Sequence, residues 1–136
     1  MVNEAVLKGE THIPINFTCS TAVTIEKGAI VKLTSPMTAV LADGDDDIVA
    51  GIVQSEKLGA DTTQTSVSVF RGGIFRVTAS GSISAGAPVA TSATTASNSV
   101  YAAAVNAENI LGIMLEDATD GQTKLMELRP TTMNLA

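Results

Sequence analysis

Two short apolar runs near the end of the chain, 110–115 and 124–128, flank a polar segment that contains Asp120 and Gly121. An Asp-Gly pair suits a turn in which glycine takes a positive φ, so the pattern predicts a β-hairpin. Apolar residues fall on both alternating faces of the two strands. Because both faces are apolar, we expect this hairpin inside a sandwich or barrel, or in a contact between subunits.

The same pattern occurs earlier in the chain, at a nearly constant spacing. The similar pairs of segments are 25–31 with 83–89, 50–53 with 111–114, and 65–71 with 123–129, at offsets of 58, 61 and 58 residues. The repeat predicts two similar halves, each with a turn glycine, a strand, a variable loop, a glycine-containing strand and an alternating strand. Two copies are too few for a solenoid, so both halves are expected within one compact domain.

Further strands are predicted from short runs of β-branched and apolar residues, which cover 5–7, 29–33, 48–53, 66–70 and 74–77. The last two are expected to form a second hairpin through Gly72 and Gly73, which tolerate the turns that match strand twist. The segment 90–99 holds no large apolar residue and is expected to be a mobile surface loop, whereas 100–105 fits either a strand or a short helix. No segment has a helical stripe of helix length, so the predicted fold class is all-β.

Residues 1–20 are predicted to form an N-terminal arm or edge strand, which leaves 21–136 as a single β domain. Within this segment, Ile13, Ile15 and Phe17 occupy alternate positions. Pro14 has no N–H to donate to a central ladder, which favours an edge strand or an extended arm. An extended apolar arm can add to the sheet edge of another chain, so Ile13, Pro14, Ile15 and Phe17 are candidate contacts with a partner protein.

Composition and charge limit the function classes. The formal net charge is −6, the isoelectric point is near 4.5, and the eight Lys and Arg residues are scattered. No basic footprint for nucleic acid is present. Aromatic residues make up 3% and Trp is absent, which argues against a carbohydrate-binding module that stacks sugar rings on aromatic side chains. The first residues do not read as a secretory signal, and no apolar run approaches the roughly 18 residues that cross a bilayer, so no membrane contact is expected.

The residues that catalysis needs are mostly missing. The single histidine, His12, lies in the N-terminal segment and no G-x-S-x-G motif occurs, so no Ser-His-Asp set is expected. Cys19 is the only cysteine, which excludes an internal disulfide and a multi-cysteine metal site. The acidic segment 43–47 lacks the calcium-loop spacing and is expected to be a solvated loop, while Asp117 and Asp120 are turn residues. We expect no enzyme activity, no metal and no cofactor.

The order of the motifs resembles a known family. The segments GAIVKL, VAGIVQ, TSVSVFRGGIFRV, ISAGAPVAT, a Ser/Thr/Ala-rich loop and ILGIMLEDATDGQTKLMELRP follow one another in this order, and the resemblance runs from about residue 6 to residue 129. This order is similar to that of the small phage capsid decoration, or cement, proteins known as the DUF2190 family. The resemblance implies a small β-barrel or β-tulip-like domain, which fits the two similar hairpin-containing halves and the extended N-terminal arm.

The resemblance also implies a function. Members of this family assemble as homotrimers on the outside of an icosahedral phage head, at three-fold and quasi-three-fold positions, and stabilise the expanded shell. The expected partners are therefore the major capsid protein and further copies of this chain, and the expected location is the outer surface of the virion. The alternatives are a carbohydrate-binding module, a head-fibre or adhesion module of a virion, and a small β-barrel enzyme, which would need a convergent polar set in a pocket.

Overall fold

The computed structural model describes residues 3–43, 48–91, 98–103 and 109–131. These residues form eleven β-strands and no α-helix, so the predicted all-β class is confirmed. The strands are β1 (Val6–Gly9), β2 (Ile15–Thr18), β3 (Ile30–Ser35), β4 (Thr38–Leu41), β5 (Val49–Val53), β6 (Ser66–Phe70), β7 (Gly73–Thr78), β8 (Pro88–Thr91), β9 (Val100–Ala102), β10 (Ile110–Met114) and β11 (Thr123–Thr131). A helix long and apolar enough to cross a membrane is not found among the described residues.

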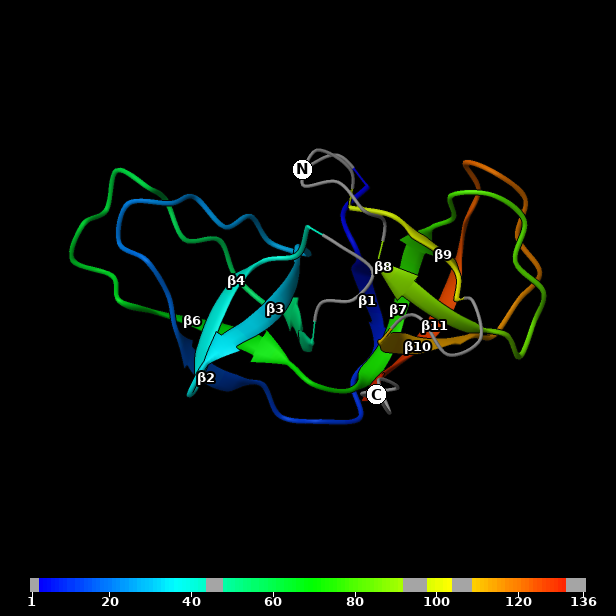
Figure 1. The fold of residues 1–136 in the computed structure, drawn as a ribbon, viewed down its shortest axis with the longest axis horizontal. Helices are drawn as coiled ribbons and strands as arrows, with labels where there is room; N and C mark the ends of the chain where they lie inside the picture. Colours follow the sequence, from blue (N-terminus) through cyan, green and yellow to red (C-terminus); the bar gives the residue numbers. More distant parts are fainter. Residues whose placement is uncertain (1–2, 44–47, 92–97, 104–108, 132–136) are drawn as a thin grey trace.

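The strands form two units that lie side by side (Figure 1). The first unit is a closed barrel with the strand order β2-β4-β3-β5-β6, and the second is a six-stranded sheet with the order β1-β7-β11-β10-β8-β9. Long loops extend from the outer end of each unit, 19–29 and 54–65 from the barrel and 79–87 and 115–122 from the sheet (Figure 1). The chain therefore begins in the second unit with β1, builds the barrel, and then returns to complete the sheet.

The two units share one internal plan, as the sequence repeat predicts. In the barrel β3 pairs with β4 and β5, and β5 pairs with β6; in the sheet β8 pairs with β9 and β10, and β10 pairs with β11, all antiparallel. The turn hydrogen bonds recur as well. Gly28 N donates to Val53 O at 2.9 Å, and Gly86 N donates to Met114 O at 2.7 Å. The prediction of two similar halves is confirmed.

A single parallel bridge lies at a comparable place in both units. In the barrel this bridge joins Thr18 of β2 to Thr38 of β4. In the second unit it joins Ala79, just after β7, to Val100 of β9. The second unit remains a six-stranded sheet, in which this isolated bridge joins the end of β7 to β9. Closure of the barrel removes most of the free backbone edge that an open sheet exposes.

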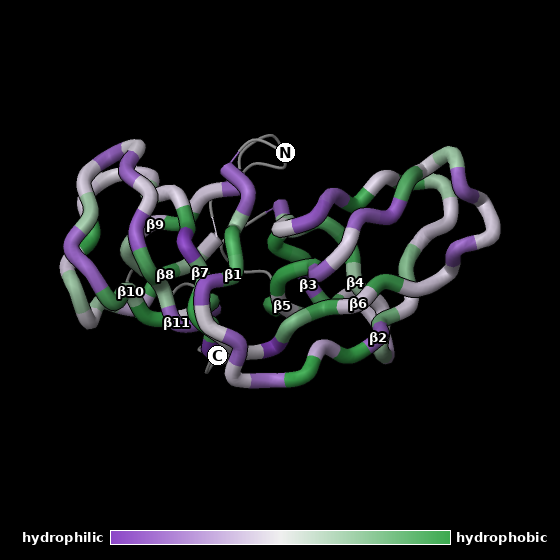
Figure 2. The backbone as a smooth tube through the Cα atoms, turned by 180° about the vertical axis from the view of Figure 1, so that it is seen from behind, coloured by the Kyte–Doolittle hydropathy of each residue, from purple (hydrophilic) through white to green (hydrophobic). Residues whose placement is uncertain are grey.

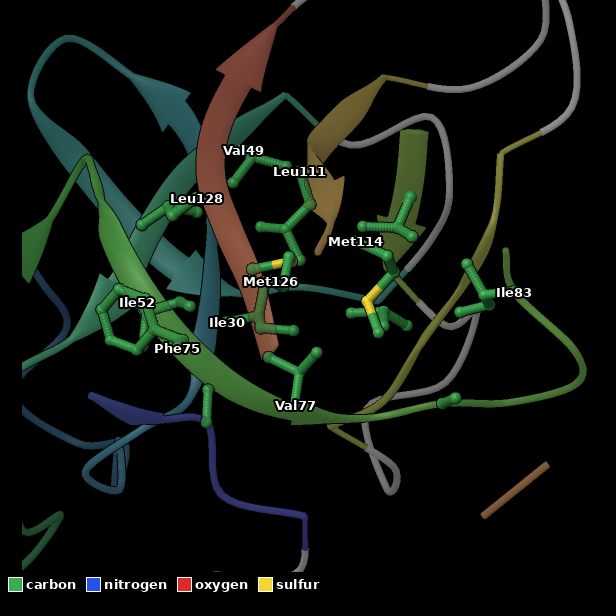
Figure 3. Packing of buried hydrophobic residues seen from close by; sticks show 14 of the residues in the cluster. Ile30, Val49, Ile52, Phe75, Val77, Ile83, Leu111, Met114, Met126 and Leu128 are labelled. Atoms are coloured by element: carbon green, nitrogen blue, oxygen red, sulfur yellow. The ribbon is translucent and has the colours of Figure 1, made fainter. Parts of the chain in front are cut away.

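A shared hydrophobic core holds the two units together through β5. All five residues of β5 are buried. Val53 belongs to the cluster that fills the barrel, whereas Val49 and Ile52 belong to a larger cluster with strands of the second unit. Figure 3 shows Ile52 and Phe75 in this larger cluster. Phe75 also meets Phe70 of the barrel edge to face, with ring centroids 5.7 Å apart, a favourable aromatic geometry.

The predicted hairpin between 66–70 and 74–77 is wrong. β6 is hydrogen-bonded to β2 and β5, and β7 is hydrogen-bonded to β1 and β11, so the two strands are not neighbours. Gly72 and Gly73 carry the chain from the barrel to the second unit instead of reversing it. The φ of Gly73 is 135°, a value that favours glycine. Long-range pairing decided this turn, because both edges of each strand are taken by other strands.

The extended-arm interpretation of residues 1–20 is also wrong. β1 pairs with β7 as an edge strand of the six-stranded sheet, whereas β2 lies between β6 and β4 in the barrel. Both strands are therefore hydrogen-bonded into the two units. Pro14 does not interfere, because it precedes Ile15, the first residue of β2, where a missing N–H costs no ladder bond.

The loop predictions have mixed outcomes. β4 was not predicted, and Val100–Ala102 is a strand rather than a helix. The segment 90–99 was expected to be a mobile loop, but its first two residues belong to β8. Near its end, Asn98 is hydrogen-bonded to the barrel: Ile30 N donates to Asn98 Oδ1 at 2.8 Å, and Asn98 Nδ2 donates to Gly28 O at 2.7 Å. Residues 44–47, 92–97 and 104–108 lie outside the described residues.

Candidate interaction surface

The single histidine lies at the molecular surface. His12 is exposed, and its Nδ1 lies 2.8 Å from Thr11 Oγ1. Across 3–43, 48–91, 98–103 and 109–131, no group of three His, Cys, Asp or Glu side chains is placed to hold a metal ion. Of the acidic segment, Asp43 is described and its carboxylate pairs with Lys32 at 2.5 Å. The surface also carries several exposed large apolar side chains, which are a more promising basis for a binding site.

The four candidate contact residues do not share one environment. Ile13 is 85% exposed and Ile15 is 43% exposed, so both are accessible to a partner. Pro14 between them is half-buried. Phe17 is only 3% exposed and packs in the cluster that fills the barrel. Phe17 is therefore a core residue and cannot also be an exposed anchor, because its side chain packs inside the barrel.

Replacing Phe17 by alanine is expected to lower the free energy of unfolding by about 3 kcal/mol, because it leaves a cavity in the barrel. Ile13→Ala is the matched control from the same segment and should change stability by less than about 0.5 kcal/mol, since its side chain is exposed. Urea denaturation measures both values. Equal stability of the two variants would contradict the placement of Phe17 in the core.

One face of the six-stranded sheet carries apolar side chains that the rest of the chain does not cover completely. Along β7 and β11 buried residues alternate with more accessible ones, so one side of the sheet faces the core and the other faces outward. On this outer sheet face Leu125 lies opposite Arg76, and Glu127 lies opposite both Ile74 and Ile113. The outer sheet face comprises Val6, Ile74, Arg76, Ile113, Leu115, Leu125 and Glu127.

A groove of about 510 Å³ runs beside β1, where the two units meet. Its apolar lining residues include Leu7, which is half-buried, and the core residues Val53, Phe70 and Phe75, which are at most 3% exposed. Its other lining residues are Glu4, Ala5, Val6, Glu10, Lys27, Gln54 and Ser55. Figure 2 shows β1 at the side of the second unit that faces the barrel. We call this cavity the β1 groove.

The loops at the outer end of the barrel are fixed by a buried lysine, which the sequence did not single out. Lys57 has 0% exposure, and its ammonium group donates to three backbone oxygens: Thr21 O at 2.6 Å, Val23 O at 3.1 Å and Leu58 O at 3.1 Å. In the second unit the equivalent bridge, Ile83 with Ala118, has no such cation. Because Lys57 lies in an unpatterned loop of the sequence, no periodicity could have identified it.

Two aspartates organise the outer loops of the second unit. Asp120 Oδ1 accepts a hydrogen bond from Gly81 N at 2.9 Å, and Asp117 Oδ1 accepts one from Ala85 N at 2.7 Å. Asp120 lies in a turn, as predicted, whereas Asp117 lies outside the turn and bonds to the other loop instead. They hold 79–87 and 115–122 together, so these loops form one body at the end of the unit (Figure 1).

The lone cysteine is buried in the barrel. Burial raises the pKa of the Cys19 thiol above its ordinary value of 9.0, and the positive charge of Lys57 partly opposes this rise. The folded state therefore favours the protonated thiol. The stability that the protonated Cys19 thiol contributes is fully present below pH 9, the pKa of an exposed thiol, and is lost as the pH rises through the higher pKa of Cys19 in the folded protein. Cys19 alkylation can serve as a reporter of barrel opening.

Comparison with known proteins gives a structural likeness without sequence similarity. The sequence matches no known protein-family profile and no curated protein. Among solved structures, it is similar to the N base of the head fibre gp8.5 in bacteriophage phi29, with a TM-score of 0.55. The match covers 91% of this chain and 98% of that chain at 14% identity. The chain therefore shares the fold of a phage head-fibre base over nearly its whole length.

Proposed function

We propose that this protein is a bacteriophage virion protein that decorates the capsid as a cement protein. In this role it binds the outer surface of the icosahedral head at three-fold and quasi-three-fold positions and stabilises the expanded shell. The observation that carries the proposal is the likeness of nearly the whole chain to the base of a phage head fibre. The order of sequence motifs points to the same class of protein. The protein acts by binding, and the proposal includes no catalytic step and no cofactor.

The outer sheet face supports the assembly of several copies. It combines apolar side chains with the oppositely charged Arg76 and Glu127, a composition found at interfaces between proteins. Contact between copies would remove Leu125 and Leu115 from water. A homotrimer buries one such face on every copy if the contact is repeated around a three-fold axis.

Light scattering of the purified protein is expected to give a mass three times that of the 13.9 kDa chain. Leu125→Lys should yield the monomer, because it places a charge in the middle of the buried face. Leu58→Lys is the matched control, since Leu58 is an exposed leucine on a barrel loop outside this face. A monomeric wild-type protein, or equal loss of the trimer in both variants, would count against this interface.

Attachment to heads is tested with expanded heads assembled from the major capsid protein encoded in the same genome. The purified protein is expected to co-sediment with these heads, and electron microscopy of the complex should show added density at three-fold and quasi-three-fold positions. Decorated heads should also resist heating better than bare heads, because a ligand that binds only the intact shell stabilises it. Failure of the wild-type protein to bind would contradict the proposal.

The base of a head fibre is the second candidate, because the similar solved structure has that role in its own virion. The same micrographs distinguish the two roles by the density at each occupied position. A decoration protein shows a compact knob of the size of this chain or its trimer. A fibre base instead shows a long projection that continues away from the head.

A further inference from the structure

A strained turn projects an apolar side chain from the barrel. Residues 36 and 37 form the turn between β3 and β4. Met37 has a φ of 50°, in the left-handed region that glycine and asparagine occupy at little cost. Its side chain is 51% exposed, so burial among the described residues does not account for a methionine here. Backbone strain of this kind persists at sites that bind a partner, because the side chain is needed there.

Two further apolar side chains lie on the same side of the barrel as Met37. Ile13 is the most exposed large apolar side chain of the described residues, and Ile15 is also accessible. Thr18, at the end of β2, donates its N–H to Met37 O at 2.6 Å, so the turn lies beside β2. The linker before β2, the start of β2 and this turn all lie along the lower edge of the molecule in Figure 1 and in Figure 2. We call Ile13, Ile15 and Met37 the barrel-edge patch.

The strands around the barrel-edge patch carry no formal charge. The segments 11–25, 33–42 and 62–70 contain no Asp, Glu, Lys or Arg, although these residues make up 16% of the chain. They comprise β2 and the two strands that pair with it, β4 and β6. Charged residues are depleted, and methionine is enriched, at the core of interfaces between proteins. The composition therefore favours an uncharged protein surface as the occupant, and not nucleic acid or a charged peptide.

The size of the barrel-edge patch indicates how it is used. A stable dimer buries about 800 Å² on each partner, whereas this patch is built from three large side chains. One such contact is weak by itself. It becomes strong when linked copies bind a repetitive surface together, because the second and third copies then bind at a high effective concentration. The shell of a phage head is a repetitive surface of this kind.

We infer that the barrel-edge patch docks this protein on the capsid shell, where it binds an uncharged, apolar surface of the major capsid protein. Ile13 and Met37 are the anchors, and Ile15 extends the apolar contact. The inference rests on the proposed function, since it names the site of attachment to the head. The outer sheet face lies on the other unit, so it stays free for contacts between copies.

The test compares Met37→Gly, Ile13→Ser and the double variant with the wild-type protein in co-sedimentation with expanded heads. Each single substitution should weaken binding at least about tenfold, and both together about a hundredfold, because each removes one apolar side chain from the contact. Leu58→Ser is the matched control. Leu58 is exposed on the barrel loop 54–65, away from the barrel-edge patch, so this variant should bind as the wild-type protein does.

Met37→Gly separates binding from folding. Glycine adopts a positive φ without steric cost, and this gain offsets the greater freedom of glycine in the unfolded chain. The variant should therefore melt no more than about 2 °C below the wild-type protein, and light scattering should give the wild-type mass for the double variant. A large loss of thermal stability in Met37→Gly, or a changed mass of the double variant, would assign the patch to folding or to contacts between copies and overturn the inference.

The remaining outcomes distinguish this inference from the proposed function. Equal decoration of heads by the wild-type protein and the double variant would reject this inference and leave the proposed function standing. Failure of the wild-type protein to bind heads would reject both. Binding of the wild-type protein to phosphatidylcholine vesicles, with loss of that binding in the double variant, would assign the patch to a lipid surface and would also overturn the inference.

Discussion

Gly112→Ala is expected to lower the free energy of unfolding by about 4 kcal/mol, which is near the upper limit for one substitution. A Cβ at this position would lie 2.1 Å from Glu127 O on β11. That oxygen belongs to the backbone of a paired strand, so it cannot rotate away. β10 and β11 would have to separate, and the second unit would lose the hydrogen bonds between these two strands.

Gly51→Ala should be equally damaging, since Gly51 holds the equivalent position in the barrel. Its Cβ would lie 2.0 Å from Phe70 O on β6, and its φ is 149°. Gly121→Ala is the control: Gly121 has a φ of 83° but nothing lies within 4 Å of a Cβ there, so only backbone strain of about 1 kcal/mol is expected.

Urea denaturation measures the stability of all three glycine variants, and the rate of Cys19 alkylation reports on the barrel separately. Gly51→Ala should speed alkylation, because the thiol lies in the cluster that the substitution disturbs. If both Gly51→Ala and Gly112→Ala lower the free energy of unfolding by less than about 1 kcal/mol, the paired strands can move apart easily. That result would contradict the view that both units need a glycine at this position for close strand pairing.

Lys57→Ala is the second substitution with a large expected effect, a loss of about 4 kcal/mol. It would leave the carbonyl oxygens of Thr21, Val23 and Leu58 without their donor, and an unsatisfied buried acceptor costs about 1 to 3 kcal/mol. Lys57→Met keeps most of the aliphatic stem and removes the charge. It should therefore be only about 1 kcal/mol more stable than Lys57→Ala, because it restores the packing of the stem but not the three hydrogen bonds.

The thiol gives an independent readout of the Lys57 charge. Because the charge of Lys57 lowers the pKa of Cys19 against the larger effect of burial, Lys57→Met should raise the pKa of the Cys19 thiol further. Titration of thiolate absorbance against pH measures this change in the folded protein. Wild-type stability together with an unchanged thiol titration in Lys57→Met would show that the ammonium group does not organise these loops.

The sequence alone determined the elements that depend on local pattern and repetition. Alternating apolar residues around an Asp-Gly turn identified the strand pair that became β10 and β11, and the offset of about 60 residues identified the two similar units. Both are properties of neighbouring residues or of direct comparison along the chain. The glycines at 51 and 112 were visible as part of the repeat, although the close strand approach that requires them was not.

The tertiary structure alone decided which strands became neighbours and which faces became core. The local pattern around Gly72 and Gly73 fits a hairpin, yet β6 and β7 belong to different units, because each has both of its edges paired with strands that are distant in sequence. Tertiary packing also separates Ile13 from Phe17: both are apolar residues of one segment, but Phe17 lies in β2 and packs inside the barrel, whereas Ile13 precedes β2 and is exposed. The β1 groove and the Lys57 contacts likewise arise from residues that are far apart in sequence, so no local pattern could predict them.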